Sequence, residues 1–225
     1  MLFEFDARPS HSPFVKEVWH ARNERPGSFH SIASTHWGMV VTLRNGKATM
    51  TVRGPQTKAT ILHCEPDGEW VGIWFRVGSF MPNFPVSALV DNDPTLPGAG
   101  LRTFYLDGSV WQVPDYENAD TFVDRLERKG LLVREPLVDA AMLGQLNGLS
   151  ERSIQRRFLR AAGLTQRTVR QIERARAAMA LLQRGVSILD TVHEVGFYDQ
   201  PHMTRSLKYL LGQTPAEIAA NAASE

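Results

Sequence analysis

The sequence predicts an α+β protein of two domains, with a β-rich N-terminal half and an all-α C-terminal half. Short alternating strands separated by Asn-Gly and Asp-Gly turns occupy the first half, whereas helical periods with N-cap and terminal Gly signals occupy the second. All the tryptophans, Trp19, Trp37, Trp70, Trp74 and Trp111, lie in the first half. We therefore predict an antiparallel β-barrel or sandwich over 1–117, a helix and linker over 118–136, and a helical domain over 137–221.

The composition is that of an ordinary globular protein, with 43% hydrophobic and 22% charged residues among 225. No apolar run approaches the roughly 18 residues of a membrane span, and residues 1–6 lack the basic and apolar regions of a signal peptide. We therefore expect a cytoplasmic protein without a membrane partner. The single Cys64 excludes an internal disulfide and a multi-cysteine zinc site.

Charge is distributed unevenly, although the formal net charge is only +1. Residues 1–135 hold 14 Lys/Arg against 16 Asp/Glu, and residues 136–225 hold 11 against 8. The excess is concentrated in residues 150–176, where 8 Arg face 2 Glu. A basic patch on a nearly neutral protein indicates a polyanionic partner that one surface contacts.

Turn signals organise the first half. Asn45-Gly46 joins predicted strands 39–43 and 47–52 as a tight hairpin. Pro66-Asp67-Gly68 separates strands 59–64 and 70–77, and Asp107-Gly108 separates strands 103–106 and 109–113. A further strand is predicted over 14–20. The Pro- and Gly-rich region 82–100 is predicted to be a loop with at most one short helical turn.

Trp70, Trp74 and Arg76 alternate onto one face of strand 70–77 and are the candidate effector-binding residues. Indole rings and a guanidinium can hold a small planar or anionic molecule. The alternative is that a helix or a second subunit covers the two tryptophans.

The other reactive side chains in this half predict neither a metal site nor a catalytic site. His63, Glu65 and Asp67 alternate, but they lack a partner pair at ligand spacing, so we predict no metal site and no cofactor. His30 and His36 are expected in turns or at the surface. Cys64 is expected to be a small buried thiol, because no neighbouring base is evident. We predict no catalytic residue and no enzyme activity.

Residues 150–163 form the central predicted element, a helix with Ser150 as N-cap and Gly163 as its end. Its apolar stripe is Ile154, Phe158 and Ala161. The opposite face carries Arg152, Gln155, Arg156 and Arg160. Arg and Gln make paired hydrogen bonds to guanine and adenine edges in the major groove, so this helix is a predicted DNA recognition helix.

A second unit of the same kind follows. In the first unit, a predicted helix over 137–146 ends near Asn147-Gly148 and precedes the recognition helix. In the second, a helix over 188–195 precedes a helix over 200–211, which Asp199 caps and which has Pro201 in its first turn. Its apolar stripe is Met203, Leu207, Leu210 and Leu211. The opposite face carries His202, Arg205, Lys208 and Tyr209.

Two further helices are predicted around these units. The helix over 167–184 is on the order of 27 Å long at 1.5 Å per residue, which suits a rod between recognition helices in successive major-groove segments. The helix over 118–130 has the apolar stripe Phe122, Val123 and Leu126, which we expect to pack on the β-rich half or, alternatively, on a second subunit. Residues 131–135 are predicted to be an extended linker before Pro136.

Motifs in the second half resemble those of the AraC/XylS transcription regulators. Residues 148–158 are similar to the first signature of that family, 174–182 to its linker helix, and 196–208 with 212–215 to its second signature. The resemblance covers 137–220 and implies a sequence-specific DNA-binding regulator. Its base-facing positions fall on Arg152, Gln155 and Arg156 in the first unit, and on Pro201, Arg205 and their neighbours in the second.

The chain departs from the family pattern in both halves. Pro201 cannot read a base, so His202 or Arg205 must carry that half-site. Thr191-Val192 stand where the family usually has an aliphatic residue and an alanine, so we expect the packing of the helix over 188–195 to differ slightly. The first half resembles, less closely, the cupin-like β-domains that bind effectors or dimerise in this family, but the His-x-His metal set of cupins is absent.

The predicted partner is double-stranded DNA, read in two adjacent major-groove segments. Arg157, Arg160, Arg167 and Arg170 are expected to contact phosphates. The resemblance implies a small-molecule effector, a homodimer and RNA polymerase as further partners. Two alternatives stay open, namely a cupin-type enzyme with a DNA-binding tail and a regulator whose first domain only dimerises. An alkyl-transfer DNA repair regulator is disfavoured by the single Cys64.

Overall fold

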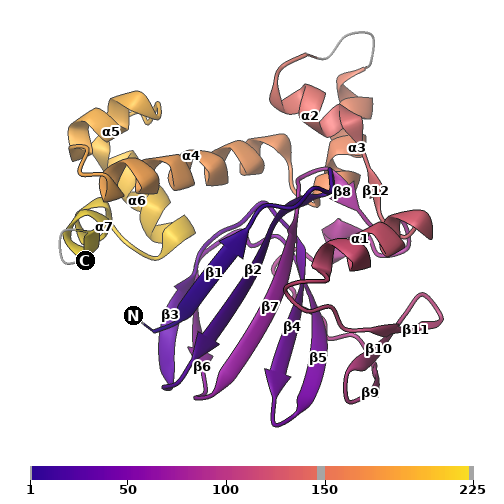
Figure 1. Ribbon diagram of the computed structural model, residues 1–225. Coiled ribbons are helices and arrows are strands. Elements are labelled where there is room, and N and C mark those ends of the chain that lie inside the picture. Colours follow the sequence, from indigo (N-terminus) through magenta and orange to yellow (C-terminus); the bar gives the residue numbers. More distant parts are fainter. Residues whose placement is uncertain (1, 146–149, 223–225) are drawn as a thin grey trace. The chain divides into compact units, whose positions relative to one another are not determined.

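The computed structural model describes residues 2–145 and 150–222, and within it the chain divides into two compact units (Figure 1). The first unit comprises Met1–Gly27, His36–Pro55 and His63–Gln166. The second comprises Ser28–Thr35, Gln56–Leu62 and Arg167–Glu225. Each unit is described by itself below.

The strands and their bounds are β1 (Glu4–Arg8), β2 (Val15–Asn23), β3 (Gly27–Ser31), β4 (Gly38–Arg44), β5 (Lys47–Arg53), β6 (Thr60–Cys64), β7 (Gly68–Phe75), β8 (Ser79–Phe80), β9 (Gly98–Gly100), β10 (Thr103–Leu106), β11 (Ser109–Gln112) and β12 (Val133–Arg134). Strands β4 to β7, β10 and β11 follow the predicted turn signals, and β2 corresponds to the strand predicted over 14–20, whereas β1, β3, β8, β9 and β12 were not predicted. The β4–β5 turn has positive φ angles at Asn45 (50°) and Gly46 (74°), as a tight hairpin requires. The predicted loop over 82–100 contains one short 3-10 helix, η1 (Val86–Ala88), followed by β9.

The first unit is built on a five-stranded antiparallel sheet with the order β1-β2-β7-β4-β5. In the described residues β1 and β5 do not pair with each other, so this sheet is open. Strands β11-β10-β9 form a second sheet and β12-β8 a third. β6 and β7, which flank Asp67, pair with different strands, since β6 pairs with β3 while β7 lies between β2 and β4. The predicted antiparallel β-fold is confirmed.

One face of the sheet forms the core. Val71, Ile73 and Phe75 of β7 are buried there, and Phe75 stacks on Trp37 with ring centroids 4.2 Å apart. Helix α1 (Ala119–Arg128) covers part of the same core with the predicted stripe Phe122, Val123 and Leu126. Its packing on the β-rich half is therefore confirmed.

Residues that follow α1 continue this core. Leu131 and Leu132 are buried in it, and β12 pairs with β8. The segment predicted as a linker is thus extended, and it is also an integral part of the first unit. The domain boundaries at 117 and 136 stay a prediction.

The helices of the second half are α2 (Pro136–Met142), α3 (Glu151–Ala162), α4 (Gln166–Gln183), α5 (Ile188–Glu194), α6 (Gln200–Leu211) and α7 (Pro215–Ala222). Those predicted over 150–163, 167–184, 188–195 and 200–211 correspond to α3 to α6 and are confirmed. Helix α7 was not predicted.

The helix predicted over 137–146 is too long at its C-terminal end. α2 ends at Met142, and Gly144 adopts a left-handed φ of 70°. The N–H of Gln145 then donates to the carbonyl of Ala140 at 2.8 Å, a bond that closes a helix end and prevents another turn. Leu146 and the predicted Asn147-Gly148 end lie outside the described residues.

Candidate nucleic-acid interface

Helix α3 presents the predicted base-reading side chains to solvent. Ser150 caps it, its hydroxyl accepting from the N–H of Ser153 at 3.3 Å, and Gly163 ends it with a left-handed φ of 73°. Phe158 and Ala161 are buried, which turns the opposite face outward. The exposed side chains of that face are Arg152, Gln155, Arg156 and Arg160. These three guanidinium groups and one amide can form hydrogen bonds with base edges or phosphates.

An ion pair ties α3 to the preceding helix. Arg157 holds Glu135 through two bonds, Nε to Oε2 at 3.0 Å and Nη2 to Oε1 at 2.6 Å. The same carboxylate caps α2, because it accepts from the N–H of Leu137 at 3.2 Å. Partial burial would raise the pKa of Glu135, but these bonds and the nearby charge of Arg160 outweigh it and lower that pKa. Glu135 therefore fixes the angle between α2 and α3 as an ionised group.

The predicted phosphate-contacting arginines are not equivalent. Arg157 is engaged with Glu135, whereas the guanidinium of Arg160 lies 5.7 Å from the Phe80 ring centroid. Arg167 and Arg170 are exposed on the first turns of α4. Arg157 therefore already has a carboxylate partner, whereas Arg160 has an aromatic contact.

The α5–α6 pair repeats this construction in the second unit. Ser187 caps α5 by accepting from the N–H of Asp190 at 3.1 Å, and Asp199 caps α6 by accepting from the N–H of His202 at 2.6 Å. The predicted stripe Met203, Leu207, Leu210 and Leu211 is buried. Asp199 and Pro201 begin the helix as predicted from the sequence.

The polar face of α6 is less open than that of α3. His202 is half-buried, and its ring lies edge-on to Phe197 with centroids 5.3 Å apart. The ammonium of Lys208 lies 3.5 Å from Glu217 of α7. Arg205 is exposed and has no partner among the described residues, so its guanidinium is available to a ligand.

An exposed aromatic residue beside α6 was not among the predicted sites. Tyr198 is 90% exposed in the turn between α5 and α6, directly before the N-cap Asp199. Its ring is accessible to a partner and lies beside the N-terminus of α6. Its position next to the N-cap, outside the apolar stripe, is the sequence signal that identifies it.

Comparison with known families agrees with this geometry. Residues 143–221 are similar to a helix-turn-helix domain. The match supports an AraC-type DNA-binding C-terminal region and, through it, a DNA-binding transcription regulator. Neither the curated proteins nor the solved structures gave a match.

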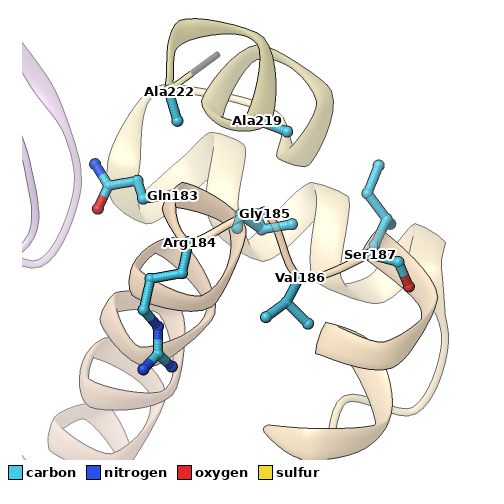
Figure 2. Close-up of a pocket in the computed structure, with 9 residues that line it drawn as sticks. Gln183, Arg184, Gly185, Val186, Ser187, Ala219 and Ala222 are labelled. Carbon is cyan, nitrogen blue, oxygen red and sulfur yellow. The ribbon is translucent and has the colours of Figure 1, made fainter. Parts of the chain in front are cut away.

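A pocket of about 470 Å³ lies in the second unit, where the α4–α5 turn meets α7 (Figure 2). Arg184 points away from Ala219 and Ala222 in this view, so the lining beside α7 is mainly aliphatic. The pocket contains none of the predicted DNA-contacting side chains.

The predicted effector residues lie on the other face of the five-stranded sheet, away from the core. Trp70 and Trp74 flank Gly72, and the Trp19 indole lies so flat over Gly72 that a Cβ there would come within 2.1 Å of it. Trp19 stacks on Trp74 and also on Phe5 of β1, with centroids 6.1 Å apart in both pairs. We call Phe5, Trp19 and Trp74 the aromatic row. Arg76 is exposed immediately after β7.

The remaining candidates are the metal-ligating side chains and Cys64. The described residues contain no group of three or more His, Cys, Asp or Glu side chains that can hold a metal ion. Cys64 is buried, as expected, and its thiol donates to the carbonyl of Gly27 at 3.4 Å. Among the residues that the structure describes, no helix is both long enough and apolar enough to cross a membrane.

Proposed function

We propose that this protein is a sequence-specific transcription regulator in which α3 and α6 read adjacent major-groove segments of double-stranded DNA. The observation that carries the proposal is the exposed Arg152, Gln155 and Arg156 face of α3, a capped helix within the helix-turn-helix match. α4, at 18 residues, supports the spacing, since its length of about 27 Å suits two successive groove segments. RNA polymerase is a further expected partner.

Selection from random DNA followed by electrophoretic mobility shift tests this proposal. We expect an enriched bipartite site whose affinity falls steeply with salt, because several arginines displace counterions from phosphates. A triple variant, Arg152→Ala with Gln155→Ala and Arg156→Ala, is expected to lose preference for one half-site. Failure of the wild-type chain to enrich any sequence contradicts the proposal.

We further propose that the N-terminal half binds a small effector against Trp70, Trp74 and Arg76. The aromatic row supports this, because its near-parallel rings offer a surface for stacking a planar molecule, and the Arg76 guanidinium offers an anion partner. A thermal-shift screen of aromatic, acidic and sugar ligands is the test. We expect a stabilising aromatic acid whose effect Arg76→Ala abolishes and Arg102→Ala, with the same loss of charge, preserves.

The competing interpretation is that this half only dimerises. It is favoured by Phe5, which is 62% exposed on β1 at the edge of the sheet. Sedimentation analysis distinguishes the two: a screen without any stabiliser, combined with a dimer that Phe5→Ser dissociates, supports dimerisation alone.

A further inference from the structure

Helix α6, the second candidate recognition helix, is packed against strand segments as well as helices. Ser28–Thr35 and Gln56–Leu62, both from the N-terminal half of the sequence, belong to the same compact unit as α4 to α7. We call these two segments the strand arm. Its strands β3 and β6 pair, and Ser34 and Gln56 exchange two backbone N–H···O bonds of 2.9 Å.

The strand arm completes the C-terminal end of α6. A helix leaves its last four carbonyls without partners inside the helix. The carbonyl of Leu210 accepts from the N–H of Ala33 at 2.7 Å, and that of Tyr209 accepts from the N–H of Ala59 at 3.0 Å. The ring of His30 also lies against Gly212, where a Cβ would come within 2.7 Å of Cδ2. Both segments of the arm therefore hold the last turn of α6.

The same arm is attached to α4. The hydroxyl of Thr35 donates to Glu173 at 2.6 Å, and Nη1 of Arg176 donates to the carbonyl of Ala33 at 3.2 Å. Ala33 is fully buried, with its N–H bonded to α6 and its carbonyl to α4. Thr35 is only 2% exposed. The short buried segment around Ala33 and Thr35 thus connects α4 to α6.

We infer that the strand arm positions α6 for DNA, so that Thr35, Glu173 and Arg176 are positioning residues for the second half-site although none of them needs to touch a base. The inference rests on the proposed function. A contact that fixes the angle between α4 and α6 sets how well α6 enters the groove, whereas α3, in the other unit, does not depend on it.

Thr35→Val in the full chain tests the inference, because it removes the hydroxyl bond to Glu173 while preserving the shape of the side chain. Binding is measured on two duplexes derived from the selected site, one with only the α3 half-site intact and one with only the α6 half-site intact. We expect about five-fold weaker binding to the α6 duplex, the effect of losing one hydrogen bond, and unchanged binding to the α3 duplex. Thr35→Ser, which keeps the hydroxyl, is expected to restore binding.

Glu173→Ala is the second variant, since Glu173 is exposed and alanine favours a helix, so the chain is expected to fold. Thr49→Val on β5 is the matched control in the first unit. The inference is overturned if these variants lose affinity equally for both duplexes or lose affinity for neither. It is also overturned if the wild-type chain binds only the α3 duplex. A wild-type chain that binds neither duplex instead contradicts the proposed function.

Discussion

Arg156 illustrates how the burial of one face of a helix determines which side chains the opposite face exposes. Phe158 and Ala161 anchor α3, so the Arg156 side chain is exposed to solvent. A guanidinium can form two hydrogen bonds to a guanine, and an arginine at this position therefore contributes to specificity as well as to affinity.

For Arg156→Ala we predict a loss of about 1–3 kcal/mol on the preferred DNA site and relaxed choice at one base pair. Binding isotherms on the selected site and its single-base variants measure both effects. Arg102→Ala, in the turn before β10, controls for the lost charge. Unchanged affinity for every site variant contradicts the assignment of Arg156.

Thr191 shows a local conflict between a side chain and its surroundings. It is fully buried in α5, and its hydroxyl has no hydrogen-bond partner among the described residues. An unsatisfied buried hydroxyl lowers the free energy of unfolding. The departure from the family pattern at Thr191-Val192 therefore has a physical consequence.

We predict that Thr191→Val raises the free energy of unfolding by about 1 kcal/mol, because valine has the same shape without the unpaired hydroxyl. Urea denaturation followed by circular dichroism measures the change. Thr204→Val in α6 is a contrasting control, since that hydroxyl donates to the Gln200 carbonyl at 2.9 Å. A destabilised Thr191→Val variant would show that the hydroxyl does have a partner.

At the scale of elements, Glu135 couples two helices through one carboxylate. It caps α2 and receives both bonds from Arg157 of α3, so the angle within the first helix pair depends on its charge. The lowered pKa of Glu135 means that the folded state favours the ionised form. The stabilisation is complete above the ordinary carboxyl pKa of about 4.3 and is lost as the pH falls through the lower, folded-state pKa.

Glu135→Gln is accordingly predicted to lower the thermal midpoint at pH 7 and to differ less from the wild type as the pH is reduced below about 4. Thermal unfolding across pH 3 to 7 provides the comparison. The matched control is Glu127→Gln in α1, whose carboxyl is at an exposed position. A constant difference between Glu135→Gln and wild type at every pH would contradict the coupling.

At the scale of the whole molecule, the chain passes repeatedly between its compact units, at 27/28, 35/36, 55/56, 62/63 and 166/167. The strand arm is therefore covalently continuous with the strands on both sides of it, β2 and β4 for one segment and β5 and β7 for the other. A change in those strands reaches the strand arm through the backbone, and the end of α6 through the hydrogen bonds of Ala33 and Ala59.

A fragment of residues 137–225 contains the helix-turn-helix match but not the strand arm. We predict that α6 in this fragment exchanges its amide hydrogens faster than in the full chain, because the last turn loses the packing and the two donors supplied by Ala33 and Ala59. In the full chain the N–H groups of Ala33 and Ala59 are expected to be protected. Exchange rates in α5 serve as the internal reference, because α3 also loses contacts in the fragment, including Glu135 and Phe80. Equal exchange of α6 in both forms contradicts the prediction.

Local chemistry made much of the architecture predictable. Caps and glycines mark both ends of α3 and α6, and Asn45-Gly46 marks the hairpin, because each signal acts within a few residues. The error at α2 came from choosing the later of two local stop signals, since Gly144 ends the helix before the expected Asn147-Gly148.

The sequence by itself determined the helical units, the exposed Arg152, Gln155 and Arg156 face, and the antiparallel strands. Only the tertiary structure decided that β6 pairs with β3, that Trp19 fills the space between Trp70 and Trp74, and that the strand arm holds α6. The physical reason is that Ala33 and Ala59 act through backbone N–H groups, which every residue except proline carries. Such contacts have no side-chain signature and join residues far apart in the chain, so no local pattern can reveal them.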